Sequence, residues 1–342
     1  MKHLVKKGNF NKVSRNKFIL IKTIFKPFNK LVNLVLKIGN LFIIWRNGKA
    51  IGDQVMMAGL ARILRLKYNS KIIVITNYPN LLELSPWISK SISPRQIKGW
   101  FFLYYLLKLF EGQRVIEYNF PYKLFGYNNH LEAYRSGFYE KLNKPAIWHA
   151  HVADRFNSDF FANYVGGLER SRCKIVEKLI EDTRKNFSSH KIGIINPVGK
   201  ETYTKSKLFG FDNYQHIVNL TSNKIKWFQV GLAEDKVLKN LRGDCRGNSL
   251  EFLVNLVSFS DLVLADEGLL NHIAGSFPNV NSYVTFSEFS PINYYSYKNT
   301  TTVGIPKKKE IYYWGKDPVK NSYKINTAKQ ISKLILNKEF LE

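Results

Sequence analysis

The sequence predicts an α/β protein with two doubly wound, Rossmann-like domains. Three observations lead to this prediction. Short apolar runs of strand length end in Gly, Asn or Asp, and stretches with helical spacing of apolar residues follow them. The order strand, helix, strand occurs near the N-terminus and again in the second half of the chain. A chain of 342 residues is also too long for one compact module and long enough for two.

The first half contains one strand–helix–strand unit. Leu41–Trp45 and Lys71–Thr76 are apolar runs typical of buried strands. The helix between them opens at Gly52 and Asp53. Gly52 permits close approach to the backbone, and Asp53 is suited either to cap the helix or to act as a base facing the ligand.

The second half repeats this order with more strands. The predicted strands are Lys191–Asn196, Ile225–Val230, Asp261–Ala265 and Asn281–Phe286. The predicted helices are Asp212–Thr221 with Asp212 as N-cap, Ser249–Phe259 with Ser249 as N-cap, and Thr327–Leu336. Ligands of such sheets bind at the carboxyl ends of the strands, so we expect the site in a cleft between the domains.

Composition predicts the domain boundaries. Residues 1–40 form a basic amphipathic arm, 41–167 the N-terminal α/β domain, 168–187 a charged connector helix and 188–342 the C-terminal α/β domain. The longest apolar run outside the arm, Trp100–Phe110, is too short to span a bilayer and contains Lys108. A buried helix is the first interpretation of this run, and an exposed patch facing lipid is the second.

The charge is strongly positive and unevenly distributed. The chain has 52 Lys and Arg against 26 Asp and Glu, and the first 52 residues carry twelve Lys and Arg before the first acid, Asp53. This excess points to a polyanionic neighbour or a phosphorylated ligand. A helix entered through Pro27 has one apolar face, Phe28, Leu31, Val32 and Val35, and one polar face, Lys30, Asn33 and Lys37. Such a helix either docks on anionic lipid or packs on the protein's own body.

A second chemical segment, Asp266-Glu267-Gly268, directly follows a predicted strand. Backbone N–H groups at the helix start beyond it are suited to bind phosphate, and Gly268 allows close approach. Lys205 and Lys207, in the loop after the strand 191–196, are able to add positive charge opposite a diphosphate. For either lysine, a solvated surface position is the alternative.

Several classes of site are disfavoured, and we expect neither a metal nor a cofactor. No Asp-x-Asp pair occurs, and His149 and His151 are not part of an acidic Cys/His cluster for a metal site. The G-x-S-x-G, Walker and G-x-G-x-x-G motifs are also missing from the sequence. Cys173 and Cys245 are too few for a disulfide framework, which favours a reducing compartment.

Together these motifs resemble glycosyltransferase family 9, the heptosyltransferase-like enzymes of bacterial surface-polysaccharide assembly. The first half matches through IGDQVMMAGLAR at 51–62, followed by the strand KIIVIT. The second half matches through Ser249-Leu250-Glu251, the strand DLVLA and an acid-x-x-x-x-His segment that ends at His272. In the family this segment usually begins with Asp and has its Gly one position later, whereas here Glu267 takes the place of the Asp. The resemblance covers residues 41–290.

The resemblance implies a GT-B-like architecture with two facing domains and a metal-independent transfer that inverts the anomeric carbon. It assigns Asp53 as the general base for the acceptor hydroxyl, with Gly52 and Gln54 on the acceptor side. Lys207 matches a phosphate-binding lysine, Asp235 a ribose-binding acid, and Asn248 a position near the base. The full set expected on the donor side is Thr202, Lys205, Lys207, Gly231, Asp235, Asn248, Asp266, Glu267, Gly268 and His272.

The implied partners are a nucleoside-diphosphate sugar donor and an anionic lipopolysaccharide-core or other surface-glycan acceptor. The basic arm fits a peripheral position on the cytoplasmic face of the bacterial inner membrane. No nucleic-acid recognition motif is present, so we expect no nucleic acid. The alternative is a non-catalytic polyanion-binding protein that retains the two-domain fold, and donor hydrolysis would separate the two.

Overall fold

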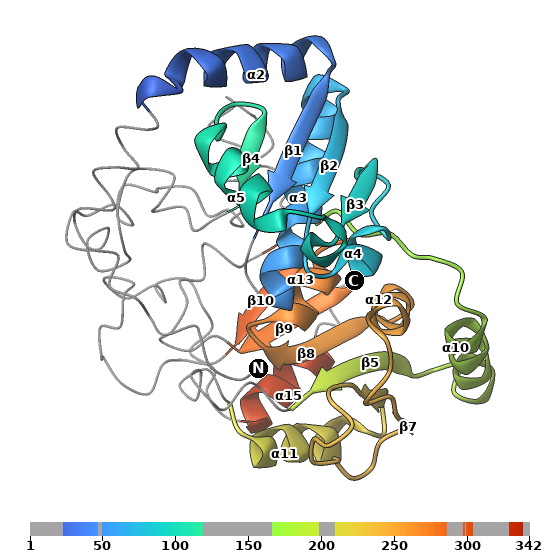
Figure 1. Cartoon of the computed structure of the whole chain (residues 1–342). Coiled ribbons are helices and arrows are strands. Elements are labelled where there is room, and N and C mark those ends of the chain that lie inside the picture. Colours follow the sequence, from blue (N-terminus) through green and yellow to red (C-terminus); the bar gives the residue numbers. More distant parts are fainter. Residues whose placement is uncertain are drawn as a thin grey trace.

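The computed structural model describes residues 23–46, 50–118, 166–197, 209–285, 297, 299–303 and 328–337 (Figure 1). These residues form two sheets with strand orders β3-β2-β1-β4 and β10-β9-β8-β5-β6-β7. Each pairing between neighbouring strands is parallel, so the carboxyl ends of the strands in a sheet share one edge. The predicted α/β class with doubly wound parallel sheets is confirmed.

The N-terminal sheet is built around β1, which pairs with β2 on one side and β4 on the other. Its elements are α2 (Lys26–Ile38), β1 (Leu41–Trp45), α3 (Ile51–Tyr68), β2 (Lys71–Ile75), α4 (Pro79–Leu82), β3 (Lys90–Ile92), η1 (Pro94–Gln96), α5 (Trp100–Leu109) and β4 (Val115–Glu117). Both predicted strands of this half are confirmed. Every residue of α3 from Gln54 to Ala61 is buried, as expected for a helix covered on all sides.

The C-terminal sheet holds the predicted strands of the second half. Its elements are α10 (Lys174–Asn186), β5 (Lys191–Asn196), α11 (Phe211–Thr221), β6 (Ile225–Gln229), β7 (Gly243–Asp244), α12 (Leu250–Ser258), β8 (Leu262–Asp266), α13 (Leu269–Ala274), β9 (Asn281–Thr285), β10 (Thr300–Val303) and α15 (Ala328–Asn337). The bounds of β5 equal the predicted ones, and α10 lies within the stretch predicted as the connector helix.

One of the two predicted helix caps is confirmed and the other is wrong. The Ser249 hydroxyl accepts a hydrogen bond from the Phe252 N–H at 3.1 Å and caps α12. At α11, however, the cap is Gly210, which has a φ of 102°, and Asp212 lies in the first turn. Glycine adopts this positive φ without strain, so the helix begins before the aspartate.

The first interpretation of Trp100–Phe110, a buried helix, is wrong. Only Leu107 of α5 is buried, while Phe101 and Phe102 are 74% and 69% exposed. One stripe of the helix packs on Trp45 and its neighbours, and the rest of the aromatic surface faces away from the sheet. The run is apolar on more sides than the sheet can cover. Its exposed side chains agree with the exposed patch of the second interpretation.

The two sheets meet through α3 and α13, which lie side by side between them (Figure 1). A single cluster of buried apolar side chains runs from Met56 in α3 to Ile273 in α13. The segment entering the second half is wedged against α3, because a Cβ at Gly167 would lie only 2.0 Å from the Ala58 carbonyl oxygen. Glycine is therefore required for this close approach of two backbones.

No helix in the described ranges is both long enough and apolar enough to cross a membrane.

Candidate active site

The two motifs that the sequence singled out meet where α3 begins and α13 begins. A Cβ added to Gly52 would lie 2.8 Å from Cδ2 of His272 and 3.6 Å from the Leu269 backbone nitrogen. The first contact is closer than a side chain allows without a shift of the imidazole. The Gly-Asp turn of the first half therefore touches the acid-x-x-x-x-His segment of the second half directly.

Asp53 lies in the first turn of α3, but no side chain caps that helix. Its carboxylate instead accepts a hydrogen bond from Arg46 Nη2, while Arg46 Nη1 donates to the Tyr118 carbonyl oxygen at 2.8 Å. The Arg46 and Asp53 side chains are 9% and 18% exposed. Of the two alternatives for Asp53, capping is absent, and an arginine anchored at the carboxyl ends of β1 and β4 orients the carboxylate.

The Gln54 side chain, expected on the acceptor side, is fully buried. Its Oε1 accepts a hydrogen bond from the Thr76 hydroxyl at 2.8 Å, and Thr76 follows the end of β2. Gln54 thus ties α3 to the carboxyl edge of the N-terminal sheet. This contact positions the first turn of α3, and the place of Gln54 on the acceptor side stays a prediction.

His272, predicted to lie on the donor side, belongs to a buried chain of polar groups. Its Nδ1 is 3.1 Å from the Tyr297 hydroxyl, and its Nε2 is 3.6 Å from Oε1 of Glu267. Burial, and then the negative charge of Glu267, raise the pKa of Tyr297 well above its ordinary value. The tyrosine hydroxyl therefore keeps its proton beside Nδ1 of His272.

The neighbouring acid, Asp266, links several segments at the carboxyl end of β8 through hydrogen bonds. Its Oδ1 accepts hydrogen bonds from the Phe209 N–H at 3.1 Å, from the Tyr214 hydroxyl at 2.8 Å and from the Thr285 hydroxyl. Burial, followed by the Asp266 charge, raises the pKa of Tyr214 well above its ordinary value. Asp266 thus joins β8 to β9 and to the start of α11.

The predicted phosphate-binding residues Thr202, Lys205 and Lys207 lie outside the described residues. The described chain resumes at Phe209, whose backbone N–H is bound to Asp266. The loop that carries the two predicted lysines therefore ends at a point anchored to the carboxyl end of β8. Among the described residues, the atom nearest to the position of a Cβ on Gly268, which lies between Glu267 and α13, is the Asp266 carbonyl oxygen at 3.9 Å.

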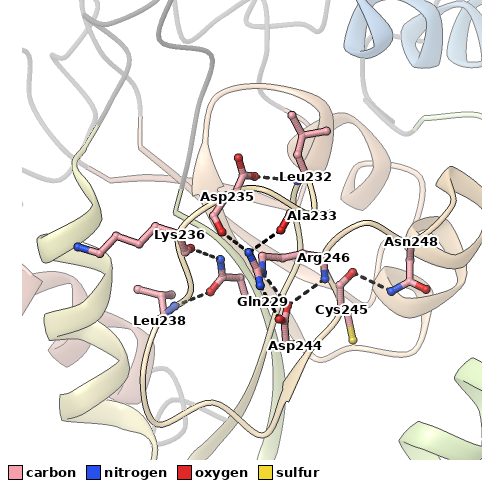
Figure 2. A network of polar contacts seen from close by, with 10 residues as sticks. All are labelled: Gln229, Leu232, Ala233, Asp235, Lys236, Leu238, Asp244, Cys245, Arg246 and Asn248. Atoms are coloured by element: carbon pink, nitrogen blue, oxygen red, sulfur yellow. Dashed lines mark hydrogen bonds and ion pairs between the residues drawn. The ribbon is translucent and has the colours of Figure 1, made fainter.

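Two loops at the carboxyl ends of β6 and β7 carry the predicted nucleotide-side residues, and Arg246 joins them (Figure 2). Its Nη1 donates to the carbonyl oxygens of Ala233, at 3.0 Å, and of Asp235. Its Nε and Nη2 donate to the two carboxylate oxygens of Asp244 at 2.8 and 2.7 Å. This bidentate pairing lowers the pKa of Asp244 from its ordinary value.

Within the first of these loops, the Asp235 carboxylate accepts a hydrogen bond from the Leu232 N–H at 2.7 Å. Gly231 has a φ of 146°, and a Cβ there would lie 2.4 Å from Asp235 Oδ2, so glycine is required. The buried Gln229 braces the loop from inside, through the Lys236 carbonyl oxygen and the Leu238 N–H, each at 2.7 Å (Figure 2).

Asn248 lies on the second loop, where its side chain donates to the Cys245 carbonyl oxygen at 3.0 Å (Figure 2). The second loop is held to the first by a hydrogen bond from the Gly247 N–H to the Gly231 carbonyl oxygen at 2.9 Å. The structure therefore brings Gly231, Asp235 and Asn248 together on one braced surface, and brings Gly52, Asp53, Glu267 and His272 together at the domain junction.

Sequence reasoning missed three residues of this arrangement: Arg46, Tyr297 and Arg246. Arg46 had a usable signal, since a cation directly after a buried strand lies at the edge where ligands bind. Tyr297 had none, because it reaches His272 from a distant segment. Among the described residues, no group of three His, Cys, Asp or Glu is placed to hold a metal ion, and His149 and His151 lie outside them.

No protein-family model and no curated protein matches the sequence. Solved structures do match. A family 9 glycosyl transferase from Veillonella parvula is 12% identical with a TM-score of 0.55, over 87% of this chain and 97% of that one. The ADP-heptose LPS heptosyltransferase II of E. coli is 13% identical with a TM-score of 0.52, over 87% and 100%.

A third match is TibC of enterotoxigenic E. coli, described as an iron-containing dodecameric glycosyltransferase. It is 11% identical with a TM-score of 0.56, over 89% of this chain and 77% of that one. Identities this low carry the fold and nothing finer. They confirm the resemblance inferred from the motifs at that level: the chain has the GT-B-type fold of the family 9 glycosyltransferases and heptosyltransferases.

Proposed function

We propose that this protein is a glycosyltransferase that moves a sugar from a nucleoside-diphosphate donor to a surface-glycan acceptor, such as a lipopolysaccharide core. The observation that carries the proposal is the direct contact of Gly52 with His272, which joins the predicted base to the predicted donor segment. The fold supports it, and a further TibC structure, at a TM-score of 0.53 and 11% identity, is described as a complex with ADP-D-β-D-heptose.

The proposed reaction is a single displacement that inverts the anomeric carbon without a metal ion. Asp53 takes the proton of the acceptor hydroxyl, whose oxygen forms the new bond to the anomeric carbon. The bond from that carbon to the diphosphate breaks, and the diphosphate leaves with the electron pair. Lys205 and Lys207 remain the predicted cations for the leaving charge. Residues 1–40 would hold the enzyme on the cytoplasmic face of the inner membrane.

A thermal-shift screen of the full chain against nucleoside diphosphates and nucleotide sugars tests the donor class. A donor at a hundred times its dissociation constant should stabilise the protein by about 2.7 kcal/mol. Hits are then incubated with the protein to measure donor hydrolysis. Binding of anionic polymers with neither a donor shift nor hydrolysis would contradict the proposal and favour the non-catalytic polyanion-binding alternative.

Asp53→Asn tests the mechanism. The amide cannot accept the acceptor proton, so turnover should fall by about 10²- to 10⁴-fold while donor affinity changes by less than about threefold. Asp212→Asn is the matched control, because Asp212 is also an acid in the first turn of a helix, α11, and is exposed. Melting curves of both variants verify folding. An Asp53→Asn variant with full turnover would remove Asp53 from the mechanism.

A further inference from the structure

The helix α2 is attached to the N-terminal domain by amide side chains. Asn33 donates to the Phe110 carbonyl oxygen at 3.3 Å and accepts from the Arg114 N–H at 2.8 Å. One turn earlier, Asn29 donates to the Glu111 carbonyl oxygen at 3.2 Å. These bonds fix how α2 is rotated about its own axis against the turn between α5 and β4.

The attached stripe leaves most of the apolar surface of α2 uncovered. Asn29, Val32, Asn33 and Leu36 form this half-buried stripe at i, i+3, i+4, i+7. At 100° per residue, Leu31, Val35 and Ile38 lie on the side away from it. The exposed apolar side chains of α2 are Phe28 at 55%, Leu31 at 52%, Leu34 at 51%, Val35 at 59% and Ile38 at 78%. We call these five residues the apolar arc.

Three lysines lie between the apolar arc and the domain. Lys26, Lys30 and Lys37 share one face and line a cavity of about 430 Å³ between α2 and the turn Gly112–Arg114. No carboxylate side chain is among the described residues that line it. Arg114 also lines the cavity, and its guanidinium stacks on the Phe42 ring, 4.1 Å from the ring centroid. The cations that α2 itself offers to an anion are the three lysines.

We propose that α2 docks in the plane of an anionic phospholipid bilayer, with the apolar arc among the acyl chains and the lysine-lined cavity at the level of the lipid phosphates. A helix with an apolar side, a basic flank and no spanning length has the features of an interfacial helix. The acid-free, twelve-cation N-terminal stretch supplies charge complementarity to such a surface. A nucleic acid would leave the apolar arc in water, and a neutral protein partner would leave the lysines unused.

The proposal deepens the membrane association that forms part of the proposed function, and it does not depend on glycosyl transfer. Flotation of the full chain with phosphatidylcholine vesicles, with and without phosphatidylglycerol, tests it. Binding should require the anionic lipid and weaken with added salt. The double variant Leu31→Gln, Val35→Gln should bind these vesicles at least about tenfold more weakly, because two buried apolar side chains are lost.

The triple variant Lys26→Gln, Lys30→Gln, Lys37→Gln should lose about fivefold per lysine, on the order of 100-fold in total, and much of the salt dependence. The helix α10 offers a matched control, because its exposed Lys174, Lys178 and Lys185 have the same spacing. A variant at Ile175 of α10, which is 73% exposed, is the control for the double variant in the apolar arc. Both α10 controls should bind as the wild type does.

Three results would overturn the docking proposal: equal binding to neutral vesicles, wild-type binding by both α2 variants, or an equal loss in the α10 controls. Loss of self-association in the Leu31, Val35 variant, with vesicle binding unchanged, would instead assign the apolar arc to a second copy of the chain. Donor thermal shifts measured on the same variants should equal those of the wild type. A failed donor screen therefore does not affect the docking proposal. A failed vesicle experiment likewise does not affect the proposed glycosyl transfer.

Discussion

Asp53 and Arg46 form an ion pair that fixes the orientation of one carboxylate. Both side chains are mostly buried, and the arginine is held in turn by the Tyr118 carbonyl oxygen. Charged groups with so little solvent need partners, and removal of one partner of such a pair is costly. The same pairing gives the carboxylate one orientation at the domain junction, which a base must have before an acceptor arrives.

Addition of one methyl group at Gly52 tests the contact between the starts of α3 and α13. We expect Gly52→Ala to push the His272 imidazole away, since the new Cβ would lie 2.8 Å from its Cδ2. The cost in unfolding free energy should be about 1–3 kcal/mol, with a larger proportional loss of turnover. Urea unfolding and transfer assays measure the two. Gly39→Ala, where the nearest atom to the Cβ is 3.4 Å away, is the control and should be nearly neutral.

Buried tyrosines make stability depend on alkaline pH. The pKa of Tyr214 is raised well above its ordinary value by burial and by Asp266, so the folded chain keeps a proton that the unfolded chain loses. Its contribution is fully present below about pH 10 and is lost as the pH rises above that. The free energy of unfolding should therefore fall in this range. Burial likewise raises the pKa of Cys245 to about 11, which adds to the fall above pH 9.

Tyr214→Phe should reduce the slope of unfolding free energy against pH above pH 10 by up to about 1.4 kcal/mol per pH unit. Urea unfolding across the alkaline range measures it. Tyr105→Phe is the control, because Tyr105 is 40% exposed and should leave the slope unchanged. An unchanged slope in Tyr214→Phe would contradict the assignment of the raised pKa to this hydroxyl.

At the scale of elements, hydrogen bonds across the loops order the carboxyl edge of the C-terminal sheet, together with the packing of buried loop residues such as Val230 and Leu238. Arg246 joins the loops after β6 and β7 (Figure 2). Asp266 joins β8 to the start of α11. Loops have few apolar contacts of their own, so hydrogen bonds to their carbonyl groups determine their shape. The predicted nucleotide-side residues Asp235 and Asn248 depend on this shape.

Arg246→Ala should therefore weaken nucleoside-diphosphate binding by about tenfold and speed amide exchange at Leu232, through loss of the bonds to the Ala233 and Asp235 carbonyls. Its ion-pair partner Asp244 is 42% exposed, so global stability should change little. Arg242→Ala, an exposed arginine of the same stretch, is the control. Equal nucleotide affinity in both variants would contradict the bracing role.

For the whole molecule, the junction of the two sheets is continuous core. The cluster that includes Met56 and Leu60 also includes Ile273 and Ala274, and Gly167 lies against the backbone of α3. Separation of domains that share a core exposes apolar surface to water, so one domain does not unfold without destabilising the other. We expect one cooperative unfolding transition by calorimetry, with a single melting temperature that a bound donor raises. Two separate transitions, only one of them shifted by donor, would contradict this expectation.

Much of the fold was predictable because its signals are local. Strands such as Lys191–Asn196 are continuous apolar runs, and the Ser249 cap follows from a hydroxyl three residues before the N–H it binds. The exposure of α5 was not predictable, since how many sides of a helix are covered depends on the elements packed around it. For the same reason, the sequence did not show that α2 attaches by its asparagines.

The sequence by itself determined the central strands of each half and the helices between them, the basic arm and the two motifs in which Asp53 and His272 stand, because periodicity and turn residues act over a few positions. Only the tertiary structure decided that Asp53 pairs with Arg46 in preference to capping α3, and that Gly52 touches His272. These contacts join residues from separate parts of the chain. Their distances are set by how α3 and α13 pack between two sheets, which no local pattern encodes.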